Sequence, residues 1–217
     1  MNWTDPVDAY CERMGEGLWA EPVNAITNLA FILAAIWVWP NVRGDRGAAL
    51  LCVSLASIGI ASGLFHTLAN QWSGAADSLS ILVYILIYIF LASRRVLGLH
   101  AVVSVALVLL FVPYAAVTAS VVGDVFGPMN GSTIYVAVAV LIILYGVMAL
   151  DRKTGHGLLI GSAILLVSIA ARSVDEAWCS AWPLGTHFLW HTLNGIMLGW
   201  MILVIHRASL AGTRARS

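Results

Sequence analysis

The sequence predicts an all-α fold, a bundle of seven transmembrane helices, and three observations predict it. Of the 217 residues, 60% are hydrophobic and only 10% are charged, whereas soluble domains carry about 25% charged residues. Apolar runs of roughly 20 residues, the length that crosses a bilayer as a helix, recur along the chain. Polar and turn-forming residues separate the runs, and no internal repeat or long linker interrupts them. We therefore expect one membrane domain.

Helices are expected where these apolar runs lie, because a helix satisfies its own backbone hydrogen bonds inside lipid. In chain order the runs are 23–42, 47–69, 76–93, 97–119, 132–150, 156–174 and 186–206. They form a domain over 23–206, preceded by an acidic amino-terminal segment, 1–22, and followed by a basic tail, 207–217. Pro113 is expected to kink or shorten the fourth helix, and the glycines of 120–131 predict a loop.

The basic residues predict the orientation of the bundle. Nine of the eleven follow the first, third, fifth or seventh helix: Arg43, Arg46, Arg94, Arg95, Arg152, Lys153, Arg207, Arg214 and Arg216. Only Arg13 and Arg172 lie at the other helix ends. Since cytoplasmic loops are enriched in lysine and arginine, we expect the amino terminus outside and the carboxyl terminus in the cytoplasm. The short loops suit a bacterial inner membrane, and the net charge of zero gives no indication of nucleic-acid binding.

Three histidines are expected at the outer end of the bundle. His66 lies near the end of the second helix, and His187 and His191 lie at the start of the seventh. The last two are four residues apart and share a helix face. Ionisable side chains inside a membrane are functional candidates, and three imidazoles are a ligand set of catalytic zinc, with a fourth position left for water. A hydrogen-bonded packing histidine is the alternative for any one of them, but the matching depth of all three favours a metal site.

Asp77 and Ser62 are expected to flank this metal. Asp77 opens the third helix at the same end, and Ser62 lies one turn before His66 on a shared face. Zinc lowers the pKa of a bound water to about 7. Asp77 is placed to take a proton from that water and pass it to a leaving group. Ser62 would orient the water or donate to the developing oxyanion, or else bond only to its own helix backbone.

The amino-terminal segment carries a cysteine and several carboxylates. Cys11 and Cys179 both fall on the outer side, where disulfides form; a bridge between them and two free thiols are the alternatives. The side chains of Asp8, Glu12 and Glu21 would offer oxygen ligands to a hard cation. The alternative is a solvated acidic face.

Two further polar groups have two interpretations each. Asp175 and Glu176 follow Arg172 at helical spacing, so they form a local ion pair or have a functional role. Asn24 and Asn28 share a face of the first helix, where they would bridge helices or help shape the site.

Several motifs, in order, resemble those of the alkaline ceramidases, which belong to a larger group of membrane hydrolases that includes adiponectin receptors. The motifs are Tyr10-Cys11-Glu12, Ala20-Glu21-Pro22-Val23-Asn24-Ala25-Ile26-Thr27-Asn28, Ser62-x-x-x-His66 with Asp77 after it, Asp175-x-x-x-Cys179 and His187-x-x-x-His191. The resemblance covers nearly the whole chain, and it depends on the order and spacing of the motifs rather than on any one of them.

The resemblance implies zinc held by His66, His187 and His191, with Ser62 and Asp77 around its water. It implies hydrolysis of the amide bond of ceramide, which gives a sphingoid base and a fatty acid. It also implies a disulfide matching Cys11 and Cys179, and a calcium site in the amino-terminal segment. The calcium pattern departs from that of the family at two positions. Ala9 stands where the family has an aspartate and Met14 where it has an asparagine, and the interval between Glu12 and Glu21 is shorter.

We therefore expect a zinc-dependent intramembrane amidohydrolase whose partners are the bilayer and a membrane lipid substrate, ceramide or a related lipid amide. The active site is expected to face the extracytoplasmic side. The alternative is a seven-helix receptor or sensor with a structural zinc and no turnover. A retinal photoreceptor needs a lysine in the last helix, and the one lysine of this chain, Lys153, lies in a loop. A transporter is disfavoured because no pair of interrupted half-helices stands out.

Overall fold

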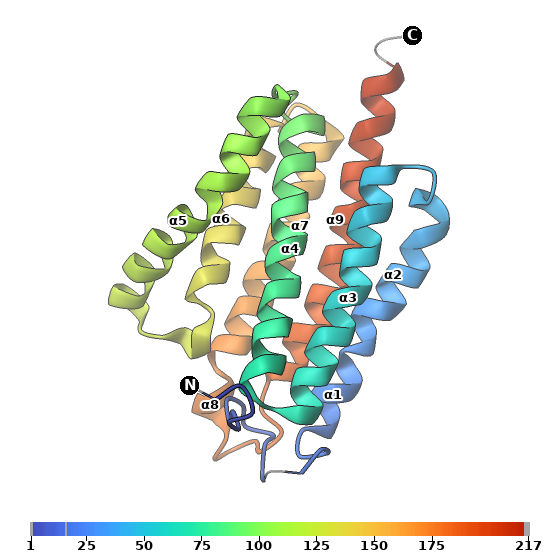
Figure 1. The fold of residues 1–217 in the computed structure, drawn as a ribbon. Coiled ribbons are helices and arrows are strands. Elements are labelled where there is room, and N and C mark those ends of the chain that lie inside the picture. Colours follow the sequence, from blue (N-terminus) through green and yellow to red (C-terminus); the bar gives the residue numbers. More distant parts are fainter. Residues whose placement is uncertain (1, 16, 215–217) are drawn as a thin grey trace.

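The computed structural model describes residues 2–15 and 17–214, and this part of the chain forms the predicted helical bundle (Figure 1). Its elements are α1 (Pro22–Thr27), α2 (Leu29–Val42), α3 (Arg46–Leu68), α4 (Gln71–Arg95), α5 (Ala101–Phe126), the 3₁₀ helix η1 (Met129–Gly131), α6 (Thr133–Met148), α7 (Lys153–Ser173), α8 (Asp175–Trp178) and α9 (His187–Arg214). With α1 and α2 taken together, the described residues contain six helices long and apolar enough to cross a membrane, and the apolar α6 is shorter. The seven-helix prediction is confirmed.

Several predicted helix boundaries are wrong. The helix α5 continues to Phe126, so Pro113 does not shorten it and 120–126 are not a loop. Proline disturbs the bond to the preceding turn without ending the helix when the residues after it are good membrane helix formers. Figure 1 shows the second half of α5 diverging from α6. The expected tail is also helical up to Arg214, while Arg216 lies outside the described residues.

The helix α4 begins earlier than predicted, at Gln71 rather than at residue 76. Ala69 ends α3 in the left-handed conformation, with φ of 42°. Asn70 then caps the start of α4. Its side chain accepts a hydrogen bond from the Ser73 backbone N–H, and the Ser73 hydroxyl accepts one from the Asn70 backbone N–H. Asp77 therefore lies almost two turns inside α4 rather than at its start. The two-residue link still makes α3 and α4 antiparallel neighbours, which brings Asp77 to the depth of His66.

Small residues bring the central helices into close contact. An added Cβ at Gly157 would lie 2.8 Å from a methyl of Val204, and one at Gly195 would lie 2.9 Å from the Ala30 backbone. Lipid supplies no hydrophobic force between helices, so close van der Waals packing of this kind stabilises the bundle. The helix α9 thereby packs against both α2 and α7, and this central position holds its histidines inside the protein.

The amino-terminal segment covers one end of the bundle. The Val7 N–H donates to the Ala69 carbonyl at 2.8 Å, and the Gln71 N–H donates to the Asp5 carbonyl at 3.1 Å. A disulfide joins Cys11 to Cys179, with a Cα–Cα distance of 5.2 Å. Figure 1 shows this segment and α8 lying at the end of the bundle opposite the carboxyl end of α9. The segment thus closes the end at which α3 finishes and α9 begins.

Candidate active site

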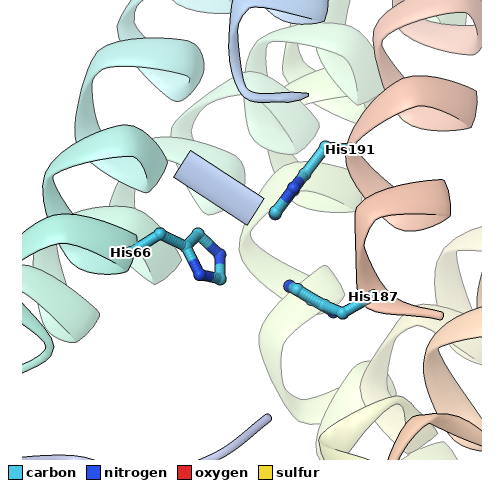
Figure 2. Close-up of side chains that lie close together, drawn as sticks. All are labelled: His66, His187 and His191. Atoms are coloured by element: carbon cyan, nitrogen blue, oxygen red, sulfur yellow. The ribbon is translucent and has the colours of Figure 1, made fainter. Parts of the chain in front are cut away.

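The three predicted histidines converge at this closed end. His66 comes from the last turn of α3, and His187 and His191 come from the first turns of α9. Each has 1% of its surface exposed, and one ligand atom from each lies within 4.8 Å of the other two. Figure 2 shows the three rings directed toward one another from the two helices. The predicted convergence is confirmed.

The outer contacts of two of these rings determine which nitrogens face the centre. The Nδ1 of His66 lies 2.6 Å from the Glu21 carboxylate, and the Nδ1 of His191 lies 3.0 Å from the Thr27 hydroxyl. The Nε2 atoms of His66 and His191 and the Nδ1 of His187 are buried without a hydrogen-bond partner. Unpaired buried polar atoms are costly. Here three such nitrogen atoms lie at one centre, and outer hydrogen bonds orient two of their rings. This arrangement fits a bound metal ion.

Glu21 is ionised in this arrangement. Burial acts to raise its pKa, but the hydrogen bonds with His66 and Arg13 and the positive charge of Arg13 outweigh burial and lower the pKa below its usual value. An ionised carboxylate accepts from the His66 Nδ1–H, so the Nε2 of His66 keeps its lone pair for a metal. The sequence predicted Glu21 only as a cation ligand, and the contact with His66 was missed.

Ser62 and Asp77 lie beside the histidines as predicted. The Ser62 hydroxyl lies next to the Asp77 carboxylate, and Asp77 lies close enough to His66 for their charges to interact. The Oδ1 of Asp77 is buried without a hydrogen-bond partner. One carboxylate oxygen next to the histidine centre is therefore open to accept a proton.

Arg172 was missed as a member of the site. Its guanidinium carbon lies 5.1 Å from the ring centroid of Trp190 and 5.7 Å from that of Tyr10. Its charge interacts with those of Asp77 and Asp175. The sequence signal was its place near the end of an apolar run on the side where basic residues are rare. The aromatic rings around the guanidinium replace water as its surroundings.

Asp175 fixes the start of α9. Its buried carboxylate accepts the backbone N–H groups of His187 at 2.8 Å, Thr186 at 2.6 Å and Cys11 at 3.0 Å. Of the two interpretations of Asp175, the structure therefore supports a role at the site through the backbone. Gly185 makes the preceding turn with φ of 65°, a conformation that favours glycine.

The three predicted calcium ligands do not form one open site. Asp8 is exposed. The two oxygens of Glu12 accept the backbone N–H groups of Val23 at 2.6 Å and Asn24 at 2.8 Å. The oxygens of Glu21 are engaged by Arg13 and His66, and Asn24 also donates to Glu21 at 3.3 Å. Among the described residues, the group of side chains that could hold a metal is the histidine trio.

Two adjoining apolar cavities lie among the helices of the bundle. One, of about 40 Å³, is lined by Phe31, Tyr135 and Trp190 among others. The second, of about 50 Å³, continues towards Tyr145. Both are bounded by residues of α4, α6 and α9, and the first includes Trp190, the neighbour of His191 in α9.

The comparisons agree with this geometry. The family model described as Ceramidase matches residues 9–216. No individual curated protein matches the sequence. The match includes the segment that carries Tyr10 and Cys11, the α3–α4 hairpin and all three histidines. Because it covers nearly the whole chain, this membrane protein belongs to the ceramidase family.

Proposed function

We propose that this protein is a zinc-dependent hydrolase that cleaves the amide bond of ceramide, or of a related lipid amide, to a sphingoid base and a free fatty acid. The observation that carries the proposal is the trio of buried imidazoles with nitrogens that lack protein partners. Three neutral nitrogen ligands beside a carboxylate are the donor set of a hydrolytic zinc site. Zinc, when bound there by His66, His187 and His191, supplies a Lewis acid for the amide carbonyl and for water.

Asp77 is proposed as the general base and acid. The free Oδ1 of Asp77 takes the proton of the attacking water, and the same carboxyl then protonates the departing amine. Ser62, next to this carboxylate, would donate a hydrogen bond that keeps it in this orientation. The positive charge of Arg172 near Asp77 favours the negative charge that develops as the carbonyl is attacked.

The substrate is proposed to reach the site from the bilayer. The cavities next to Tyr135 and Trp190 are apolar, and lipid chains are recognised by such surfaces with few polar groups. An acyl chain placed there would bring its carbonyl to the histidine centre. The lipid would pass sideways between helices, because Tyr10 stacks on His187 at a ring separation of 3.6 Å and covers the site from the end of the bundle.

The site is proposed to face away from the cytoplasm of a bacterial inner membrane. Two features support this orientation. The loops at the opposite end of the bundle carry most of the basic residues, such as Arg43, Arg94 and Arg152. The disulfide between Cys11 and Cys179 lies at the histidine end, and disulfides persist outside the cytoplasm.

The test combines metal analysis with a substrate panel on one preparation. The purified full chain is analysed for zinc and incubated with ceramides and other lipid amides, and released fatty acid is measured by mass spectrometry. We expect bound zinc and release from ceramide. His187→Ala should lose both, whereas Asp77→Asn should keep zinc and lose activity by about 100-fold or more. His156→Ala is the control, because His156 is exposed in α7 at the other end of the bundle.

The outcomes separate the candidates. A zinc-free His187→Ala protein with full activity would exclude the proposed mechanism. Bound zinc without turnover of any lipid amide would favour the receptor or sensor with a structural metal.

A further inference from the structure

Arg13 is a buried cation next to the site. Its side chain is 7% exposed, and that of its partner Glu21 is 3% exposed. The Arg13 Nε donates to the Glu21 Oε1 at 2.6 Å, and the Arg13 Nη1 donates to the Gly15 carbonyl at 2.9 Å. Arg13 is also one of only two basic residues placed at this end by the sequence. A buried charge of this kind requires a specific partner.

The Arg13–Glu21 pair continues to a candidate metal ligand. The second oxygen of Glu21 lies 2.6 Å from the Nδ1 of His66. One carboxylate thus joins a guanidinium on one side to an imidazole on the other. Because each oxygen has its own donor, Glu21 cannot rotate away from His66 without leaving Arg13 unpaired.

The same carboxylates do not fit a calcium ion. Calcium takes about six to eight oxygen ligands. Here all four oxygens of Glu12 and Glu21 already accept hydrogen bonds, and Ala9 and Met14 offer no side-chain oxygen. A guanidinium in contact with Glu21 would also repel a divalent ion at bonding distance.

We infer that the guanidinium of Arg13 takes the place of the calcium ion that the family resemblance implies in the amino-terminal segment, and that Arg13 positions Glu21 against His66. The protein binds no calcium at this place. Arg13 is a positioning residue, since it acts on the metal site through Glu21 and His66. The zinc-affinity measurement below rests on the zinc site of the proposed function, whereas the test for calcium binding does not.

The first experiment asks whether calcium binds to the zinc-loaded full chain. Calorimetric titration and thermal unfolding are carried out with and without about 5 mM calcium, which exceeds the range of weak extracellular calcium sites. We expect no heat of binding and no shift of the unfolding midpoint. A calcium-dependent rise of the midpoint, with saturable binding, would overturn the inference.

The second experiment removes the guanidinium. Arg13→Met keeps the apolar stem, and Arg13→Lys keeps the charge. We expect Arg13→Met to lower the unfolding midpoint by about 10 °C, since it removes the guanidinium from a buried carboxylate and leaves the Oε1 of Glu21 without its donor. It should also weaken zinc binding by about tenfold in competition with a chelator, as loss of an outer partner of a metal ligand does. Arg13→Lys should recover part of both losses. Arg43→Met, at an exposed position in the opposite loop, is the control.

The zinc measurement distinguishes positioning from general stabilisation. Unchanged zinc affinity in folded Arg13→Met would overturn the positioning role. If Arg13→Met does not fold, the zinc affinity of Arg13→Lys tests the positioning role in its place. The calcium titration of the wild type tests the absence of calcium without any variant. Absence of lipid amide hydrolysis in the wild type would count against the proposed function alone, because neither calcium binding nor zinc affinity depends on turnover.

Discussion

At the scale of single residues, hydrogen bonds outside the histidine centre determine which ring nitrogens are free to bind a metal. Glu21 and Thr27 each occupy an Nδ1 and leave the Nε2 of His66 and His191 facing inward. Such outer partners orient the rings and make them better ligands. Neither contact follows from the spacing of the histidines, since Thr27 and His191 are 164 residues apart.

Thr27→Val is expected to weaken zinc binding by about tenfold with little change of shape. The valine keeps the volume of threonine but cannot bond to the Nδ1 of His191. Chelator competition measures the change. Thr67→Val is the matched control, because the Thr67 hydroxyl bonds only to carbonyls of its own helix, at 3.0 Å from those of Gly63 and Leu64. Equal zinc affinity in the two variants would contradict a role for Thr27.

At the scale of helices, polar groups at the ends of the bundle determine how its elements meet. Asp175 joins the start of α9 to the amino-terminal segment. At the other end, Asp45 begins α3 by accepting the Gly47 N–H at 3.1 Å and forms two 2.7 Å hydrogen bonds with Arg95 of α4. His206 of α9 lies 3.2 Å from the same carboxylate. One side chain thus connects three helices.

Asp45→Ala is expected to destabilise the protein by about 2 kcal/mol at neutral pH, through loss of the helix cap and of the Arg95 pair. Burial acts to raise the pKa of Asp45, but hydrogen bonds with Arg95, His206 and the Ala48 backbone, and the charge of Arg95, lower it from 3.8 to about 2. Because the folded pKa is the lower one, this stabilisation is present above about pH 4 and is lost as the pH falls to about 2.

Thermal unfolding in detergent at several pH values measures this effect. The difference between wild type and Asp45→Ala should shrink over the acid range. Asp151→Ala is the control: the Asp151 side chain is 75% exposed in a 3.7 Å pair with Arg152, and removing it should matter little at any pH. A difference that stays constant from neutral pH to pH 2 would show that the charge of Asp45 is not responsible.

At the scale of the whole molecule, the distribution of charge predicts the orientation in the membrane. The end that carries Arg94, Arg152 and Arg207 should lie in the cytoplasm, and the histidine end should lie outside. A fluorescent protein that matures only in the cytoplasm, fused after residue 217, should therefore fluoresce. A phosphatase that is active only outside the cytoplasm should be inactive at the same position. The reverse pair of results would place the site on the cytoplasmic side.

The sequence by itself determined the fold class, the approximate place of each helix and the convergence of His66, His187 and His191. These features follow from local rules. An apolar run of bilayer length becomes a helix, histidines four residues apart share a face, and the membrane sets a common depth. Helix ends were less predictable, because residues such as Pro113 and Gly123 are tolerated within a membrane helix.

Only the tertiary structure decided the surroundings of the histidines: Arg13 and Glu21 behind His66, Thr27 behind His191, and Arg172 among aromatic rings next to Asp77. These contacts join segments far apart in the chain, such as Glu21 and His66, which are separated by 45 residues. No periodicity specifies such pairs. They form because charges enclosed at the closed end of the bundle must find partners among the groups that the fold brings there.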